Sequence, residues 1–447
     1  MPVPRQLAAA CADTAAAGPA DTVGGRRARY VAAPASTPEA AALLRAAAAL
    51  GLTVVPRGAG RLQHWGNPPA SCDLIVDTHR LDLIIEHRPG DFAVSVQAGV
   101  RLRDLADALA SARQQLKVLP PPRAFTGTVG GLIATNAAGG SRRYRYGTPR
   151  DLLTGITAVR ADGAIIRSGE CASTVTGQDL VTLFAGSYGT LGLITEASFR
   201  LHPAPQVSGA VWLPCTDPED AARQLAEIVS DPWLAPIGID LRWPAAGKPH
   251  GLIVTIEGDR QGFQARKDRL HALAGRTAFP LFDRARALRL DALPAAVAEA
   301  MRTRHDQFQA ELLDPPPETG TLVRASFPPE RLAAALTAIQ TSAAGKALAV
   351  GIEGPVGVGV LDVKVPADSP AAAVAQFVPA LREGLAGLGE AGPAPSPPSA
   401  VVVYAPDEVR ELTDMRGPLP SLALMQAVKD EFDPEHRMAP GRLADAA

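Results

Sequence analysis

The chain has 447 residues, of which 47% are apolar and 20% are charged, and its 44 basic and 46 acidic side chains leave a net charge of −2. At roughly 100–200 residues per domain, this length predicts two or three domains, and the composition is globular rather than disordered. The near balance of charge gives no reason to expect nucleic acid as a partner. No window carries the ~18 apolar residues of a membrane span, so we expect a cytoplasmic protein in which residues 1–29 form a frayed N-terminal extension.

Four cysteines are spread along the chain without any CxxC pair. They are Cys11, Cys72, Cys171 and Cys215. This spacing fits neither a zinc site, nor an iron–sulfur cluster, nor the disulfide framework of a small secreted protein. If the protein handles electrons, we expect any cluster to belong to a partner.

Strands and helices alternate between residues 30 and 203, which we take as the first domain. Ser-Thr-Pro-Glu at 36–39 predicts the start of a helix, and Gly51 can end that helix in the left-handed conformation. Asp-Gly at 162–163 predicts a hairpin within 156–166. Apolar patterning predicts further strands at 52–55, 74–76, 92–96 and 191–201, and a helix at 102–112.

A second domain is expected over residues 204–418, where two similar passes of strand and helix follow one another. Strands are predicted at 209–213, 237–241, 252–257, 321–327 and 400–404, with a Gly-rich pair within 348–363, and helices at 218–230, 261–274, 330–342 and 370–388. Such a pattern predicts a mostly antiparallel sheet with helices on one face, an α+β domain. Residues 419–447 form a separate C-terminal segment that begins with a helix.

Three Gly-rich segments lie between strands and helices of the first domain. They are VPRGAGR at 55–61, GTVGGLIATN at 127–136 and GSYGTLG at 186–192. Glycine lets backbone N–H groups converge on an anion without side-chain obstruction. A single loop of this kind is usually only a tight turn, and neither the dinucleotide fingerprint nor the P-loop ending is intact. Three such loops in one domain favour a dinucleotide bound by a different fold.

These loops, in this order and spacing, resemble the FAD-binding (PCMH-type) domain of the vanillyl-alcohol oxidase superfamily. The resemblance covers residues 30–203, including RYGTPRD at 145–151, with a weaker match at 432–434 and 440–442. It implies an α+β protein: a two-part FAD-binding domain of the vanillyl-alcohol oxidase type, to which the C-terminal segment returns, and an antiparallel-sheet α+β cap domain. Within the superfamily, residues 57–69 are most similar to the FAD-binding subunit of bacterial glycolate oxidase.

The resemblance also implies how each loop would contact FAD. The first loop would wrap the diphosphate, the second would line the diphosphate, ribityl chain and flavin, and the third would lie near the adenine and ribose. Pro121 would form the turn that enters the second loop. The candidate cofactor-binding residues are Pro56, Arg57, Gly58, Ala59, Gly60, Arg61, Leu62, Pro121, Thr128, Val129, Gly130, Gly131, Thr135, Asn136, Gly189 and Ile194.

The chain departs from the family pattern in three places. Position 61, where covalently flavinylated members often have His, is Arg, and Cys72 lies in no attachment motif, so we expect non-covalent FAD. Glycolate oxidase subunits usually have Lys-Asn-x-x-Gly-Tyr-Asp before the third loop, where residues 173–179 read STVTGQD. The terminal Asn-Pro-Gly is Ala-Pro-Gly at 439–441. The last two departures leave the substrate and the activity open.

Oxidation of a 2-hydroxy acid by a flavin needs a cation for the carboxylate and a base for the hydroxyl proton. Because an Arg fork pairs two carboxylate oxygens, Arg324 in the strand LVRASF is the first candidate and Arg242 the second. For each, exposure to solvent or pairing with an acid is the commoner alternative. No base stands out: His305 lies in a charged run that is most simply an exposed helix face. The His-rich cap motif of metal-using relatives is missing, so no metal is predicted.

These features predict the FAD-carrying subunit of a glycolate or D-lactate type 2-hydroxy acid dehydrogenase. Its partners would be the small 2-hydroxy acid and, for electron transfer, iron–sulfur and second flavoprotein subunits, with neither nucleic acid nor a membrane span. Two alternatives stay open. One is a stand-alone FAD oxidase that uses O₂, and the other is a non-catalytic flavin-binding assembly subunit.

Overall fold

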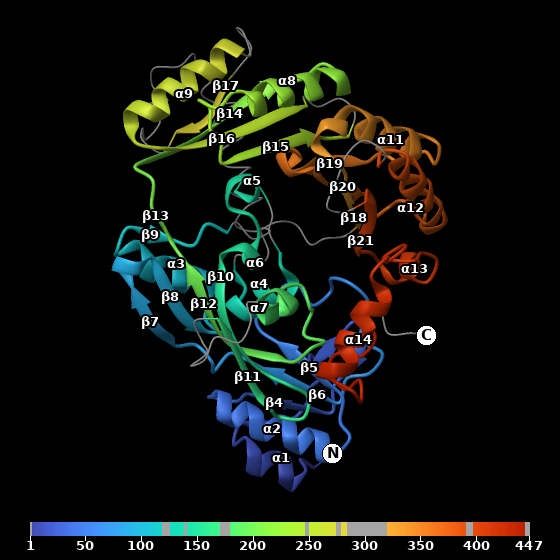
Figure 1. Cartoon of the computed structure of the whole chain (residues 1–447). Coiled ribbons are helices and arrows are strands. Elements are labelled where there is room, and N and C mark those ends of the chain that lie inside the picture. The colour runs from blue at the N-terminus through green and yellow to red at the C-terminus, as the bar shows by residue number, and fades with distance from the viewer. Residues whose placement is uncertain are drawn as a thin grey trace. The chain divides into compact units, whose positions relative to one another are not determined.

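The computed structural model divides the chain into two compact units (Figure 1). It describes residues 2–118, 126–137, 140, 142–169, 179–245, 250–273, 279–283, 320–389 and 397–442. Unit 1 consists of Met1–Ala138, Gly147–Ala204 and Leu419–Ala447, and unit 2 of Gly139–Tyr146 and Pro205–Pro418. In the described part of the chain, no helix is both long enough and apolar enough to cross a membrane.

The first sheet of unit 1 has four strands in the order β1-β4-β6-β5, of which β4, β6 and β5 run parallel. Their bounds are Thr14–Ala16 for β1, Tyr30–Ala32 for β4, Val54–Arg57 for β5 and Leu74–Asp77 for β6. Helix α2 (Thr37–Ala49) packs against this sheet through Leu43 and Leu44. Its start is capped, since the Ser36 hydroxyl accepts from the Glu39 N–H at 3.2 Å.

The first residues of the chain are ordered, so the prediction of a frayed terminus was wrong. Residues Arg5–Ala10 form helix α1, which contacts α2, and β1 pairs with β4. Leu7 and Cys11 are buried in the same core as Leu44 and Val54. The Ala-rich sequence lacks a long apolar run, but two well-placed apolar side chains are enough to dock a short helix.

The second sheet of unit 1 has five antiparallel strands in the order β11-β10-β12-β8-β7. Their bounds are Ile84–Arg88 for β7, Ala93–Gln97 for β8, Leu153–Val159 for β10, Ile165–Gly169 for β11 and Leu193–Arg200 for β12. The hairpin predicted about Asp162-Gly163 is confirmed as β10–β11, with Gly163 at φ +80°. Helices α3 (Leu102–Ala110), α4 (Val129–Thr135) and α7 (Asp179–Phe184) contribute to the same core.

Unit 2 is built on one eight-stranded sheet of order β17-β14-β16-β15-β19-β20-β18-β21, and neighbouring strands within its described residues run antiparallel. The strands are β14 (Val207–Pro214), β15 (Gly238–Trp243), β16 (Gly251–Gly258), β17 (Phe279–Asp283), β18 (Thr321–Ser326), β19 (Gly351–Gly354), β20 (Val360–Val365) and β21 (Ser399–Tyr404). Four helices, α8 (Pro218–Ser230), α9 (Arg260–Leu273), α11 (Leu332–Ala344) and α12 (Ala371–Ala386), share one core with it. The predicted α+β fold with an antiparallel sheet is confirmed.

The two faces of this sheet differ because its strands alternate. On β18 and β15, Val323, Ala325, Ile239 and Leu241 belong to the helix-covered core. The residues between them point to the opposite face, which we call the open face. Helix α5 (Arg143–Tyr146) lies on this face, away from α8 and α9 (Figure 1).

The C-terminal segment returns to unit 1 through a buried ion pair. After α14 (Leu422–Phe432), the Ala439 N–H donates to the Val54 carbonyl at 2.7 Å, beside β5. Lys429 Nζ donates to Asp433 Oδ2 at 2.6 Å and to the Thr190 and Met438 carbonyls at 2.8 and 2.9 Å. Because the Asp433 side chain is fully buried, this network fixes the chain that follows it.

We predict that Asp433→Ala destabilises the protein by about 3–5 kcal/mol, because it leaves the Lys429 ammonium buried without its counterion. The urea-denaturation midpoint, with unchanged m-value, measures the loss. Asp430→Ala on the same helix is the control: it removes a largely exposed pair with His436 and should cost no more than about 1 kcal/mol. Equal losses in the two variants would contradict the role given to the buried pair.

Candidate cofactor site

The three glycine loops of unit 1 surround one hollow that opens to solvent, with about 810 Å³ of empty space including its open side. Its wall includes most of the candidate cofactor-binding residues. They are residues 56–62, Thr128, Gly130, Gly131, Thr135, Gly189 and Ile194.

The first loop follows β5 and presents backbone to the hollow. The backbone N–H groups of Gly58, Ala59, Gly60 and Arg61 donate to no group among the described residues. Gly60 has φ +71°, a conformation that L side chains rarely adopt. Consecutive N–H groups without an internal acceptor form a nest that suits a phosphate.

The first and second loops touch at Gly58 and Thr128. A Cβ atom at Gly58 would stand 2.1 Å from Thr128 Oγ1, well inside any van der Waals contact. That hydroxyl is already used, because it caps α4 by accepting from the Gly131 N–H at 3.3 Å. Glycine at position 58 is therefore required if both loops are to face the same hollow.

The third loop packs on the other two. The Tyr188 N–H donates to the Ala134 carbonyl at 2.7 Å, which holds this loop to the end of α4. A Cβ atom at Gly189, whose φ is +75°, would stand 3.1 Å from Cγ of Pro56 in the first loop. The three segments thus converge through close backbone contacts, as expected for loops that act on one ligand.

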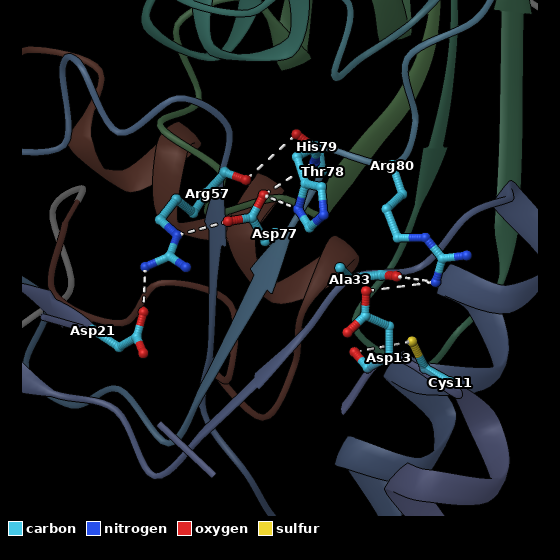
Figure 2. A network of polar contacts seen from close by, with 9 residues as sticks. All are labelled: Cys11, Asp13, Asp21, Ala33, Arg57, Asp77, Thr78, His79 and Arg80. Atoms are coloured by element: carbon cyan, nitrogen blue, oxygen red, sulfur yellow. Dashed lines mark hydrogen bonds and ion pairs between the residues drawn. The ribbon is translucent and has the colours of Figure 1, made fainter. Parts of the chain in front are cut away.

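The guanidinium of Arg57 is held by two carboxylates rather than aimed at a ligand. Figure 2 shows it between Asp77, 3.0 Å from Nε, and Asp21, 2.8 Å from Nη1. The Arg57 hydrogen bond lowers the pKa of the Asp21 carboxyl. The same Asp77 binds Nδ1 of His79 at 3.0 Å. Arg57 therefore ties the end of β5 to its neighbours, which orients the loop that starts at Gly58.

Two of the described candidate residues do not line the hollow. Val129 is fully buried in the core. Asn136 ends α4 in the left-handed conformation (φ +45°), and its Oδ1 accepts from the Arg150 N–H at 3.2 Å instead of facing the hollow. Pro121 and residues 173–178, which carry one departure from the family pattern, lie outside the described residues.

Sequence reasoning missed Arg442, which the C-terminal segment brings to the wall of the hollow. Its Nη2 donates to the Gln63 and Trp65 carbonyls at 3.0 and 2.8 Å, so it fastens the end of the first loop. Its guanidinium also lies 5.9 Å from the Tyr188 ring centroid. Pro-Gly-Arg at 440–442 is part of the family resemblance, but no local pattern in the sequence indicates that its Arg joins two loops.

The residues that are present suit a non-covalent dinucleotide. The nest and the small loop residues leave room for a diphosphate, and Leu62, Leu132 and Ile194 supply apolar wall. The thiol nearest in sequence, Cys72, is buried, and burial raises its pKa to about 12, which keeps it protonated and poorly reactive. No cluster of metal-ligating side chains occurs in the described segments.

The cap candidates occupy one row of the open face. Arg324 makes a two-pronged pair with Asp362, with Nε–Oδ1 at 2.7 Å and Nη2–Oδ2 at 2.9 Å. Arg324 thus follows the alternative given for it in the sequence analysis, in which the arginine pairs with an acidic side chain. Arg242 lies across from Glu353, which lies across from Asp362. Near α5, Arg142 pairs with buried Glu257 at 3.4 Å, and His305 lies outside the described residues.

Comparison with known proteins identifies the first unit. Residues 28–169 match the family described as FAD binding domain. The solved 4-ethylphenol oxidase of Gulosibacter chungangensis has the same fold over 98% of this chain and 95% of its own, with a TM-score of 0.70 and 16% identity. Residues 28–169 thus form an FAD-binding domain. The predictions of an FAD-binding domain and of FAD as its cofactor are confirmed, and the predicted fold is that of the solved oxidase.

Two curated relatives match a smaller part of the chain. The D-lactate dehydrogenase of Archaeoglobus fulgidus is 35% identical over 196 residues, which is 44% of this chain and 43% of the relative. The glycolate oxidase subunit GlcD of Bacillus subtilis is 34% identical over 202 residues, 45% of this chain and 42% of the relative. The matches span less than half of each relative's length.

We predict that Gly58→Ala weakens FAD binding at least tenfold, because the added methyl group collides with Thr128 Oγ1 and separates two loops that face the flavin nucleotide. Titration of the flavin-free protein with FAD, followed by flavin fluorescence, gives the Kd. Gly90→Ala is the matched control, since a Cβ there meets nothing within 4 Å.

The double variant Gly58→Ala/Thr128→Ala distinguishes a steric clash between the two loops from a general loss of structure. Without the Thr128 hydroxyl and Cγ2, the nearest Thr128 atom to the new methyl group is Cβ, at 3.3 Å. The affinity for FAD should therefore recover in part. Recovery should be incomplete because the double variant also loses the Thr128 cap of α4. A Kd for the single variant equal to that of the wild type would contradict the loop contact described above.

Proposed function

We propose that this protein is an FAD-dependent oxidoreductase that oxidises a small 2-hydroxy acid of the glycolate or D-lactate class. The observation that carries the proposal is the convergence of three glycine loops on one hollow, in a chain whose matched relatives include a D-lactate dehydrogenase and a glycolate oxidase subunit. When bound, FAD accepts a hydride from the carbon that bears the substrate hydroxyl. The remaining tasks belong to side chains.

The charged groups that such a substrate requires are proposed to come from unit 2. Its open face carries Arg242 and Arg324 in one row, and an arginine fork is suited to a carboxylate. Arg324 pairs with Asp362 through both prongs of its fork, and we propose that Arg242 is the main anchor of the substrate carboxylate. Arg324 would hold the row in place and add positive charge.

The electron acceptor is proposed to be a partner subunit. In the described segments no residue cluster could hold a metal, and the relative GlcD is named as a subunit. A partner with iron–sulfur clusters or a second flavin would take the electrons. The cytoplasm as location and non-covalent attachment of FAD stay predictions, and release of flavin on denaturation tests the latter.

The deciding experiment is an anaerobic visible spectrum of the flavin-loaded protein with glycolate, D-lactate and D-2-hydroxyglutarate in turn. Bleaching of the flavin by one of them supports the proposal. Peroxide production by the isolated chain in air would instead identify a stand-alone oxidase. Bound flavin that no 2-hydroxy acid reduces, even with the partner subunits present, would favour an assembly subunit.

We predict that Arg242→Met raises the KM for the hydroxy acid at least tenfold, because the carboxylate loses a charge-assisted partner worth about 1.5–3 kcal/mol. Arg324→Met should have a smaller effect on KM, since its fork already binds Asp362. Rapid-mixing measurement of flavin reduction against substrate concentration gives both values. Exposed Arg260 on α9 provides the control Arg260→Met, and an unchanged KM in Arg242→Met would contradict the assignment.

A further inference from the structure

Strand β7 forms an outer edge of the second sheet of unit 1 (Figure 1). Among the described residues, this strand pairs only with β8. The pairing is irregular between Ile84 and Glu86, so that Ile85 has no partner residue on β8. Such a bulge leaves the extra residue outside the ladder of hydrogen bonds. The outer side of an edge strand presents N–H and C=O groups that another strand can bind.

Three consecutive large aliphatic side chains on this edge are exposed. Leu83 is 62% exposed, Ile84 38% and Ile85 51%. None of the three belongs to a hydrophobic core of the described structure. Single exposed apolar residues are normal on a protein surface, whereas three in a row on an unpaired edge mark an interaction surface. We therefore expect a partner to cover this edge.

An acidic hollow lies at the first end of the aliphatic trio. Asp82 and Ile84 line it together with Asp104 of α3, and Arg101 and His79 complete the charged and titratable part of its wall. Asp82 is exposed and forms no hydrogen bond or ion pair within the described residues. Two carboxylates against one arginine favour a cationic group in this hollow.

A cationic side chain lies at the other end of the trio. Arg88 is the last residue of β7, and its guanidinium pairs with Glu86 and with Asp91 at 3.4 Å each. Both carboxylates are exposed, and exposed pairs of this kind contribute little to stability. The edge thus carries a negative end, an apolar centre and a positive end.

A two-fold axis at Ile85 joins two such edges with matching charges. Asp82 lies three residues before Ile85 and Arg88 lies three residues after it. In an antiparallel pair about this axis, each Asp82 therefore lies opposite Arg88 of the second copy. Two ion pairs then flank an apolar centre made by Leu83, Ile84 and Ile85 of both copies. Charges and bulges on an edge exclude strands that do not match them, whereas a second copy matches its own.

We propose that this protein forms a symmetric dimer in which β7 pairs antiparallel with β7 of a second copy. The self-complementary order of charged and apolar residues favours a second copy over an unrelated strand. Residues 82–88 form a short contact, and a standard interface buries about 800 Å² on each partner. The dimer is therefore expected to be weak, with a dissociation constant of about micromolar order. This surface takes no part in the proposed oxidation, so the two proposals stand or fall separately.

The first test measures the dissociation constant by sedimentation equilibrium of the full chain between about 1 and 200 µM. Ile85→Lys should raise this constant at least tenfold, because it replaces the apolar contact at the axis with two ammonium groups. Leu412→Lys is the matched control: Leu412 is 58% exposed but lies in unit 2, so the constant should not change.

The second test reverses charges and asks whether two variants complement each other. Asp82→Arg sets arginines opposite each other at both ends of the pair, and Arg88→Asp sets aspartates there. Each variant alone should therefore dimerise at least tenfold more weakly than the wild type at low ionic strength. An equimolar mixture of the two restores both ion pairs and should dimerise about as well as the wild type. Damage to the fold of either variant would not be repaired by mixing.

Three outcomes would overturn the dimer. A wild-type chain that stays monomeric at about 200 µM would exclude self-pairing and assign the β7 edge to a different protein. An Ile85→Lys variant that dimerises like the wild type would place the contact elsewhere on the molecule. A mixture of Asp82→Arg and Arg88→Asp that stays monomeric, with both variants folded by circular dichroism, would contradict the two-fold pairing about Ile85.

Discussion

The cofactor site of this protein depends on how closely backbone segments can approach one another. At Gly58 there is no space for one methyl group, because Thr128 Oγ1 occupies its position, and at Gly189 the chain turns with a positive φ against Pro56. These contacts bring three loops from distant parts of the sequence to one hollow and leave backbone N–H groups facing it. A diphosphate carries enough negative charge to use several such groups at once.

Ion pairs hold this arrangement in place, but their charged groups bind protein atoms rather than the ligand. Arg57 pairs with Asp21 and Asp77 beneath the first loop, and the buried Lys429–Asp433 pair fixes the C-terminal segment that delivers Arg442. Each of these cations binds protein oxygens. We therefore expect the nest to bind the phosphate groups, whereas the ion pairs determine where the nest lies. Loss of a buried ion pair would weaken FAD binding indirectly, because it would change the position of the loops.

Sequence reasoning succeeded where a local rule determines the structure. Glycine spacing located the loops, Asp162-Gly163 located the hairpin, and apolar alternation placed the antiparallel sheet of unit 2. It failed where the outcome depends on contacts between distant residues. Three features depend on tertiary packing that no spacing in the sequence encodes. They are the packing of α1 through Leu7, the position of Arg442 beside Trp65, and the ion pair of Arg57 with Asp21.

The same distinction explains why the cofactor is easier to infer than the substrate. Binding a diphosphate by backbone requires glycine, and that requirement appears in the sequence as a motif. Handling a hydroxy acid requires a base and a cation whose relative positions are set by the tertiary fold, and no local spacing in the sequence specifies such a pair.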